Sequence, residues 1–250
     1  MRLNREIQHL AKKLNDKLGM LKFPDHVACV YNTFDYAFGG YAAYTNKFVQ
    51  DPKKILFLGM NPGPWGMVQT GVPFGEVAAV RDWMGLHVEI RKPQPEHPKR
   101  PVEGLDCVRS EVSGRRLWGL FDDRFDSAQA FFKNHFVANY CPLAFMEAGG
   151  RNLTPDKLPA SIANPLEDAC DWHLQELTGL LEPEWVVGVG GFAETRARSA
   201  LGSASIRIGR ILHPSPASPA ANRDWAGTAT RQLVELGIWN EQGAIPCNTD

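Results

Sequence analysis

A run of apolar residues, 55–58, leads directly into an uncharged loop that spans 59–75. The loop holds five glycines and three prolines, so proline stiffens its backbone while glycine lets another group approach closely. Loops of this length are uncommon in compact domains unless they carry function. In open α/β sheets, ligands bind where the buried strands end. The pattern therefore predicts a buried strand followed by a binding loop for a neutral, planar group.

Three further stretches are predicted to be strands, and helical patterns separate them. The predicted strands are 55–58, 136–139, 185–189 and 206–212. The predicted helices are 3–18, 76–84, 115–121, 164–181, 191–200 and 220–236. Asn164 and Pro165 are interpreted as the N-cap and first-turn proline of the fourth helix. The span 85–111 has no clear period and is interpreted as a surface excursion.

Strands that alternate with helices form parallel sheets with helices on both faces. We therefore predict one domain over residues 1–250, an α/β protein built as a three-layer α/β/α sandwich around a central four-stranded parallel sheet. A helix within 1–20 precedes the sheet, and the tail at 240–250 is expected to be frayed. With 44% hydrophobic residues, the chain can bury a substantial core.

The cysteines argue against several classes of protein. All five are scattered and none forms a C-x-x-C pair, so a zinc site, an iron–sulfur cluster or a disulfide framework is not expected. We predict neither a metal nor a cofactor. The N-terminus lacks the apolar stretch of a signal peptide, and no apolar run approaches the length of a membrane span. We expect a monomer without membrane contact that is not secreted: cytoplasmic, or nuclear in a eukaryote.

Polar residues at the ends of three predicted strands should meet at one rim of the sheet. Asn61 follows the first strand, Asn139 ends the second, and His213 follows the fourth, where two prolines restrict the chain. Singly, an asparagine or histidine at such a position is more often structural. Together with Phe74 they provide two amides, one imidazole and one aromatic ring. This set suits a pyrimidine, because an amide can read its N–H and C=O edge while a ring stacks on its face.

Basic residues gather around His213. The span 196–223 contains five arginines and no acidic residue, which favours phosphate contact over a solvated face. They are Arg196, Arg198, Arg207, Arg210 and Arg223. The net charge of −1 by itself gives no sign of a nucleic-acid partner. The glycines at 188–191 lack the G-x-G-x-x-G spacing and are interpreted as a tight turn, so a nucleotide-cofactor enzyme ranks far behind.

Two motifs are similar to those of a known family. Gly59-Met60-Asn61-Pro62-Gly63-Pro64, continued by Phe74-Gly75-Glu76, resembles the first motif of the uracil-DNA glycosylase superfamily. His213-Pro214-Ser215-Pro216 resembles its second motif. Matches at Gly66-Met67, 69–73, Asn222 and Trp225 point to the single-strand-selective monofunctional branch, with the resemblance covering residues 55–240.

The resemblance implies a DNA-repair enzyme that hydrolyses the N-glycosidic bond of uracil or 5-substituted uracil, such as 5-hydroxymethyluracil, and leaves an abasic site. The base would be flipped into the pocket. Asn61 would position the hydrolytic water in a dissociative reaction with an oxocarbenium-like sugar, and His213 would stabilise charge on the uracil O2. Asn139 would read the uracil edge and Phe74 would stack on it. The resemblance also places Met60, Gly63 and Met67 along the pocket.

DNA, single- or double-stranded, is the implied partner. Small residues after His213 form a narrow ridge that could enter a groove. The residues expected to contact DNA are Ser215, Pro216, Ala217, Ser218, Pro219, Arg210 and Arg223. The family often carries an arginine where this chain has Ala217, and a neighbouring arginine is a candidate substitute. No lysine lies in 59–75 or 213–222, so simple hydrolysis without lyase chemistry is expected.

Two alternatives use the same fold. One is a non-catalytic reader of damaged DNA, against which the presence of both Asn61 and His213 argues. The other is a glycosylase for purine lesions such as xanthine or hypoxanthine. The order among these lesions, and the preference for single or double strands, stay open at this point.

Overall fold

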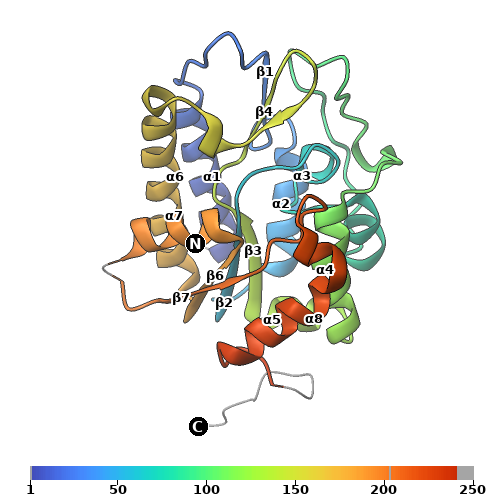
Figure 1. Ribbon diagram of the computed structural model, residues 1–250, viewed down its shortest axis with the longest axis vertical. Coiled ribbons are helices and arrows are strands. Elements are labelled where there is room, and N and C mark those ends of the chain that lie inside the picture. Colours follow the sequence, from blue (N-terminus) through green and yellow to red (C-terminus); the bar gives the residue numbers. More distant parts are fainter. Residues whose placement is uncertain (1, 203, 241–250) are drawn as a thin grey trace.

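A computed structural model describes residues 2–202 and 204–240 and confirms the predicted α/β sandwich (Figure 1). Four parallel strands form the central sheet in the order β3-β2-β6-β7. They are β2 (Ile55–Gly59), β3 (His135–Asn139), β6 (Trp185–Val189) and β7 (Arg207–Ile211). β2 and β3 are buried along their whole lengths, as expected for apolar runs between two helix layers. The tail predicted to be frayed lies, from 241 onwards, outside the described residues.

Helices cover both faces of this sheet (Figure 1). One layer holds α1 (Leu3–Leu18), α6 (Ala160–Leu181) and α7 (Gly191–Leu201), and the other holds α4 (Val112–Arg124), α5 (Ala128–Asn134) and α8 (Pro219–Glu235). A further helix, α2 (Phe38–Phe48), lies along the outer edge of β3. There the Tyr44 hydroxyl accepts from the Val137 N–H at 3.3 Å and donates to the Val137 carbonyl at 3.1 Å. This contact satisfies backbone groups at a sheet edge.

A second, antiparallel sheet, which the sequence did not predict, stands near the carboxyl ends of the parallel strands (Figure 1). Its strands are β1 (Cys29–Asn32), β4 (Leu143–Met146) and β5 (Asn152–Leu153), in the order β1-β4-β5. Each has two to four residues, too few for a periodic pattern to stand out. Because β4 follows β3 after a short turn, this sheet forms a wall beside the predicted rim.

Two predicted helices differ from the structure. The helix expected at 76–84 is mostly a π-helix, η1 (Ala79–Trp83), in which the Met84 N–H donates to the Ala79 carbonyl. The chain turns away after it at Gly85, with φ +58°, where the Lys47 ammonium donates to the carbonyls of Met84 and Gly85. Lys47 thus satisfies two carbonyl groups at the end of this segment that would otherwise lack a hydrogen-bond partner within the described chain.

The helix expected to begin at Asn164 begins at Ala160 instead, so the predicted N-cap is wrong and Pro165 lies inside α6. The N–H groups of Ile162 and Ala163 both donate to the Pro159 carbonyl at 2.8 Å, which opens the helix one turn early. Proline so close to a helix start removes a single intrahelical hydrogen bond.

Smaller elements also escaped prediction. The binding loop at 59–75 contains a one-turn helix, α3 (Met67–Thr70), and the excursion at 85–111 contains the turn η2 (Gly104–Asp106). A similar turn, η3 (Pro155–Lys157), follows β5. None of the described helices is both long and apolar enough to cross a bilayer.

Two histidines are buried in the core and should make the fold sensitive to acid. Burial lowers the pKa of His135 and of His173 to about 4, from the ordinary 6.5. The unfolded chain takes up these protons first, so stability present above pH 6.5 is lost as the pH falls towards 4. We expect a loss of about 3 kcal/mol per histidine, measured by urea unfolding at pH 7.5 and 4.5.

A variant that lacks one of the two buried histidines separates this effect from general acid sensitivity. His173→Gln should flatten the fall in unfolding free energy between the two pH values, whatever its stability at pH 7.5. Replacing the exposed His87 by glutamine should leave the fall unchanged. Equal slopes in wild type and His173→Gln would show that this histidine does not carry the effect.

Candidate active site

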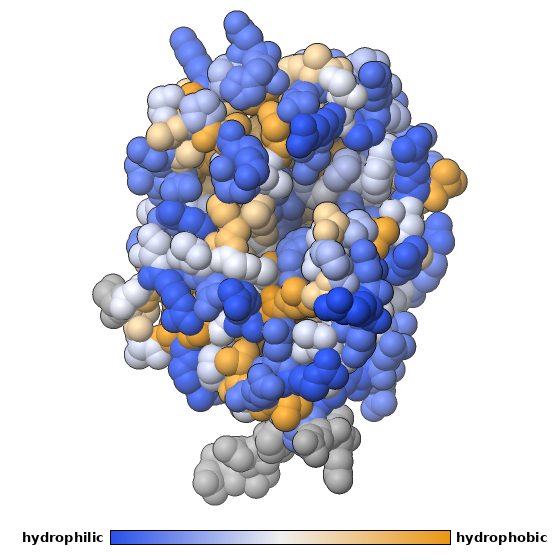
Figure 2. Space-filling view, in the orientation of Figure 1, coloured by the Kyte–Doolittle hydropathy of each residue, from blue (hydrophilic) through white to orange (hydrophobic). Residues whose placement is uncertain are grey.

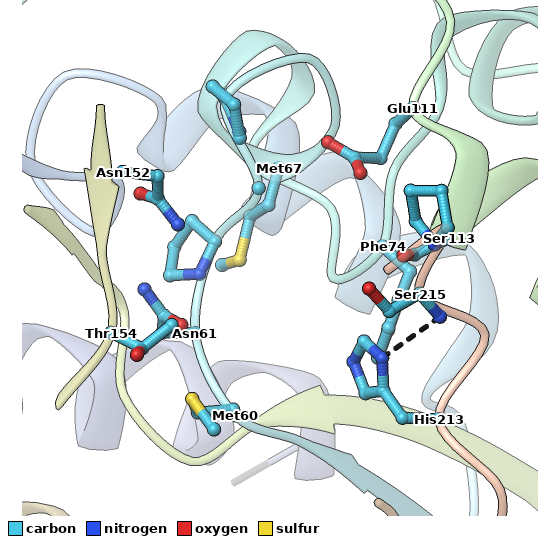
Figure 3. Close-up of a pocket in the computed structure, with 14 residues that line it drawn as sticks. Met60, Asn61, Met67, Phe74, Glu111, Ser113, Asn152, Thr154, His213 and Ser215 are labelled. Atoms are coloured by element: carbon cyan, nitrogen blue, oxygen red, sulfur yellow. Dashed lines mark hydrogen bonds between the residues drawn. The ribbon is translucent and has the colours of Figure 1, made fainter. Parts of the chain in front are cut away.

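A cavity of about 320 Å³ opens at the carboxyl ends of the parallel strands, between the second sheet and α4 (Figure 3). The surface is hollowed near the middle of this face (Figure 2). The cavity is lined by Met60, Asn61, Pro62, Gly63, Pro64, Met67, Phe74, Glu111, Ser113, Asn152, Thr154, His213, Ser215 and Pro216. The structure therefore brings together residues from both sequence motifs, which are about 150 positions apart in the chain.

Asn139 and Phe74 meet over Gly59 beside this cavity. β2 and β3 are in register, with Gly59 opposite Asn139. A side chain at Gly59 would overlap the Asn139 Oδ1 and come within 2.5 Å of the Phe74 ring, so only glycine fits here. The Asn139 Nδ2 donates to the Met67 Sδ at 3.2 Å, while its Oδ1 is buried without a partner in the described chain. A buried, unused acceptor beside an aromatic ring is suited to a ligand N–H.

Phe74 is held in an unusual backbone conformation. Its φ is +53°, a left-handed value that is rare for a residue with a side chain. Its carbonyl accepts from the Trp118 indole N–H at 3.0 Å and from the Glu76 N–H at 2.7 Å. The absence of a side chain at Gly114 leaves room for this carbonyl. Strain of this kind persists where the surroundings fix it, and here it orients the ring at the cavity wall.

Asn61 projects from the end of β2 and is tied to the second sheet. Its Nδ2 donates to the carbonyl of Leu143, the first residue of β4, at 3.2 Å. This bond orients the amide, and within the described chain its Oδ1 makes no hydrogen bond. An oriented amide oxygen at a cavity wall can accept a hydrogen bond from a water molecule.

His213 stands on the opposite side of the cavity (Figure 3). Its Nδ1 accepts from the Ser215 N–H at 3.1 Å, so in the neutral ring the proton is on Nε2. Burial lowers the pKa of His213, which favours this neutral form. The turn after β6 packs against it: Gly190 has φ +97°, and a side chain there would touch the His213 Cβ. The glycines at 188–191 thus form the predicted tight turn.

The loop that carries His213 is fastened to α4 by one arginine. Arg116 donates from Nη1 to the carbonyls of Pro214 and Ser215, at 3.1 and 3.4 Å, and from Nη2 to the Asn222 Oδ1 at 2.9 Å. Asn222 in turn donates to the Pro216 carbonyl at 2.8 Å. Beyond this point Ala217 is exposed at the tip of the predicted ridge.

Glu111 is the main cavity residue that sequence reasoning missed. It precedes α4 and accepts from the Trp65 N–H at 3.3 Å. Its carboxylate occupies the space that a side chain at Gly63 would need, and its Cγ lies close to where a side chain at Gly66 would begin. Burial raises its pKa, against the N–H groups of Trp65 and Ser113, which lower it. A cavity expected to be uncharged therefore contains a carboxylate. In the sequence Glu111 appeared only as an acid before a helix.

Asn152 and Thr154 were missed for a different reason. They line the cavity from β5 and the residue after it, a strand that the sequence did not reveal. The Asn152 Oδ1 is a second buried acceptor without a partner in the described chain. Within that part of the chain, no three His, Cys, Asp or Glu side chains gather where they could hold a metal ion.

The basic span at 196–223 is more neutral than its sequence suggested. Arg196 bonds to Glu167 at 2.7 Å and to Asp171, and its side chain is only 16% exposed. The remaining pairs are Arg198–Glu194 at 3.0 Å, Arg207–Glu184 at 3.1 Å and Arg210–Glu194 at 3.3 Å. Most of these carboxylates are distant in sequence, which is why the span looked unopposed. These ion pairs correct the expectation that all five arginines contact phosphate. Contacts of Arg210 and Arg223 with DNA stay predictions.

The fold and the two motifs at this rim define a class of protein. Residues 47–234 match the model of the uracil DNA glycosylase superfamily, and the chain belongs to that superfamily. Its branch is that of the single-strand selective monofunctional uracil-DNA glycosylases, as its motifs predicted.

Two relatives establish this branch. The chain is 50% identical over 228 residues to the single-strand selective monofunctional uracil DNA glycosylase of Bos taurus, covering 90% of this chain and 84% of that one. It is also 50% identical over 228 residues to the rat (Rattus norvegicus) protein of the same name, covering 90% of this chain and 82% of that one. The crystal structure of wild-type SMUG2 from Pedobacter heparinus matches with a TM-score of 0.68, over 96% of this chain and all of that one. At 16% identity, that likeness shows the fold alone.

Proposed function

We propose that the chain hydrolyses the N-glycosidic bond of uracil and 5-substituted uracil in DNA and leaves an abasic site. The observation that carries the proposal is the unpartnered Oδ1 of Asn139, buried beside the Phe74 ring. An acceptor there suits the N3–H of uracil. Cytosine presents an acceptor at the same ring position, so it would leave the Asn139 oxygen unsatisfied, at a substantial desolvation cost.

The base reaches this site by leaving the stack. The cavity lies below the protein surface and between two motif loops, so a base still stacked in a helix could not contact Asn139. The exposed ridge at Pro216 and Ala217 stands at the cavity mouth, where it can occupy the space that the base vacates.

Bond cleavage needs charge stabilisation on the base and a water at the sugar. The C1′–N1 bond breaks with its electron pair on uracil, and the His213 Nε2–H donates to the O2 where negative charge develops. The Asn61 Oδ1 orients a water whose oxygen bonds to C1′ of the oxocarbenium-like sugar. The proton released by that water neutralises the departing uracil. Neither residue needs to ionise for this sequence of steps.

Substituents on C5 are proposed to face Gly63 and Met67. Because Gly63 has no side chain, the Glu111 carboxylate occupies the space beside it. An ionised carboxylate accepts hydrogen bonds, so it favours a 5-hydroxymethyl group, which donates one, over the methyl group of thymine.

Excision from defined oligonucleotides tests this function. Strands containing uracil, 5-hydroxymethyluracil, xanthine, hypoxanthine or thymine are treated with excess protein, single- and double-stranded, with and without later alkali. We expect alkali-dependent breaks at uracil and 5-hydroxymethyluracil, none at thymine, and none with Asn61→Ala. Binding without breaks would favour a reader of damage, and breaks only at the purines a purine-lesion glycosylase.

Arg116 should set the rate through the position of His213. Arg116→Ala removes the donors that hold the carbonyls of Pro214 and Ser215, and a displacement of about 1 Å at a reacting group can slow a reaction about 100-fold. We expect single-turnover uracil excision to fall at least about 10-fold at saturating protein.

The neighbouring arginine gives a matched control. Arg115 is exposed and its side chain bonds only to the Ser110 hydroxyl within the described chain, so Arg115→Ala should excise uracil at the wild-type rate. Arg116→Lys keeps the charge but not the forked geometry, so its excision rate should lie between those of Arg116→Ala and the wild type. If Arg116→Ala lowers only the melting temperature, its role is structural.

A further inference from the structure

A second basic surface lies next to residues that line the cavity, away from the arginines that the sequence singled out. Its centre is Trp65, which follows the cavity-lining Gly63 and Pro64. Two guanidinium groups lie over its ring: the Cζ of Arg109 is 4.4 Å from the ring centroid and that of Arg100 is 5.2 Å away. We refer to Trp65, Arg100 and Arg109 as the Trp65 platform.

The backbone that carries Arg100 is firmly held. The Tyr31 hydroxyl donates to the Arg100 carbonyl at 2.9 Å. Gln69 donates to the Pro101 carbonyl at 3.0 Å and accepts from the Glu103 N–H at 2.8 Å. Since Gln69 belongs to α3, the platform is joined to the loop of the first motif. Charged groups placed in advance lose less conformational freedom when they bind an anion.

The guanidinium groups of the platform have unused donors within the described chain. Arg109 makes no side-chain hydrogen bond or ion pair there. Arg100 donates from Nη1 to the Lys99 carbonyl at 3.0 Å, and its Nε is buried, which leaves the Nη2 group as its free donor in this part of the chain. By contrast, the four arginines from 196 to 210 are all paired with carboxylates. A guanidinium carries five N–H donors, so the platform keeps positive charge available for an external anion.

We propose that the Trp65 platform binds the phosphate backbone of the DNA strand that flanks the flipped nucleotide. The inference rests on the proposed function, because a nucleotide in the cavity stays joined to its strand, which must leave across the rim. Each phosphate on that path carries a negative charge, and arginine binds phosphate through paired N–H groups. Aromatic rings interleaved with cations are also typical of surfaces that bind single strands.

The platform also offers a replacement for the basic side chain that is missing at position 217. Ala217 lacks the basic side chain that the family often has at the ridge. Arg100 and Arg109 come from the excursion at 85–111 (Figure 1, green loops beside α3), on the side of the first motif. The strand would then be anchored beside the first motif, and the ridge would contribute shape alone.

The salt dependence of binding tests the platform. An uncleavable strand, carrying 2′-fluorinated deoxyuridine, is titrated with wild type and with Arg100→Ala/Arg109→Ala at several salt concentrations. For single strands, each lost phosphate contact lowers the slope of log Kobs against log salt by about 0.7. We expect the double variant to lose about one to two such contacts and bind at least about 10-fold more weakly at low salt.

A second double variant is matched in charge. Arg198→Ala/Arg207→Ala removes two exposed arginines that are already paired, so its slope should stay that of the wild type. If both double variants show the same slope of log Kobs against log salt, the proposal that the platform binds phosphate is wrong. Shortening the strand on one side of the lesion should abolish the difference between wild type and platform variant, and a difference that survives shortening on both sides would also overturn it. Failure of the wild type to release uracil would contradict the proposed function instead.

Discussion

Replacing His213 with alanine is expected to slow the excision of uracil by about two to three orders of magnitude. In its neutral form the imidazole carries its proton on Nε2, and we propose that this N–H donates to the position where the uracil O2 acquires charge. Removing a donor aimed at developing charge acts on the bond-breaking step, so the loss should appear in the single-turnover rate at saturating protein. The affinity for uncleavable uracil-DNA should change much less.

The fold should survive this change, because the His213 ring is at a cavity wall and not in the core. An unaltered melting temperature would show this directly. His26→Ala, at an exposed position remote from both motifs in sequence, should cleave at the wild-type rate. A His213→Ala protein that releases uracil within a few-fold of the wild-type rate would remove this histidine from the reaction.

Replacing Gly59 with alanine should be nearly as damaging, although the change adds a single methyl group. The new Cβ would overlap the Asn139 Oδ1 and lie 2.5 Å from the Phe74 ring. Neither neighbour can yield easily, since Asn139 is bonded to Met67 and the Phe74 backbone is fixed by Trp118. We expect excision to fall about 100-fold, through displacement of the two groups that we propose read and stack the base.

Stability measurements distinguish this effect from a general glycine effect. Overpacking at Gly59 should lower the unfolding free energy by about 1 to 3 kcal/mol. Gly179→Ala, at an exposed position in α6 where a Cβ meets nothing within 4 Å, should instead raise it by up to about 1 kcal/mol. Wild-type excision by Gly59→Ala would mean that Asn139 and Phe74 do not form the base site.

The rim of the site could be predicted because parallel strands impose it. Once 55–58 and 136–139 were identified as strands of one parallel sheet, the residues at their ends had to emerge at one edge, and Asn61 and Asn139 do so. The same argument placed His213 after β7. Local patterns were sufficient here, since β2 and β6 are apolar throughout and glycine or proline follows the strands.

Features that depend on partners remote in sequence could not be predicted. Glu111 enters the cavity because Gly63 and Gly66 leave space for it, and nothing near residue 111 indicates those glycines. Asn152 reaches the cavity through a two-residue strand that exists only by pairing with β4. The basic span likewise seemed free of acids because Glu167 and Glu184 join it only in the folded chain.

Glu111 also makes the cavity a source of instability. Burial raises the pKa of its carboxyl group, so the folded state binds its proton more tightly than the unfolded chain does, and the stability linked to that proton is lost as the pH rises. Once ionised, the side chain therefore opposes folding. A glutamine there would relieve this opposition and yield a protein more resistant to heat but altered at its substrate-binding wall, as expected where activity and stability make opposite demands on one residue.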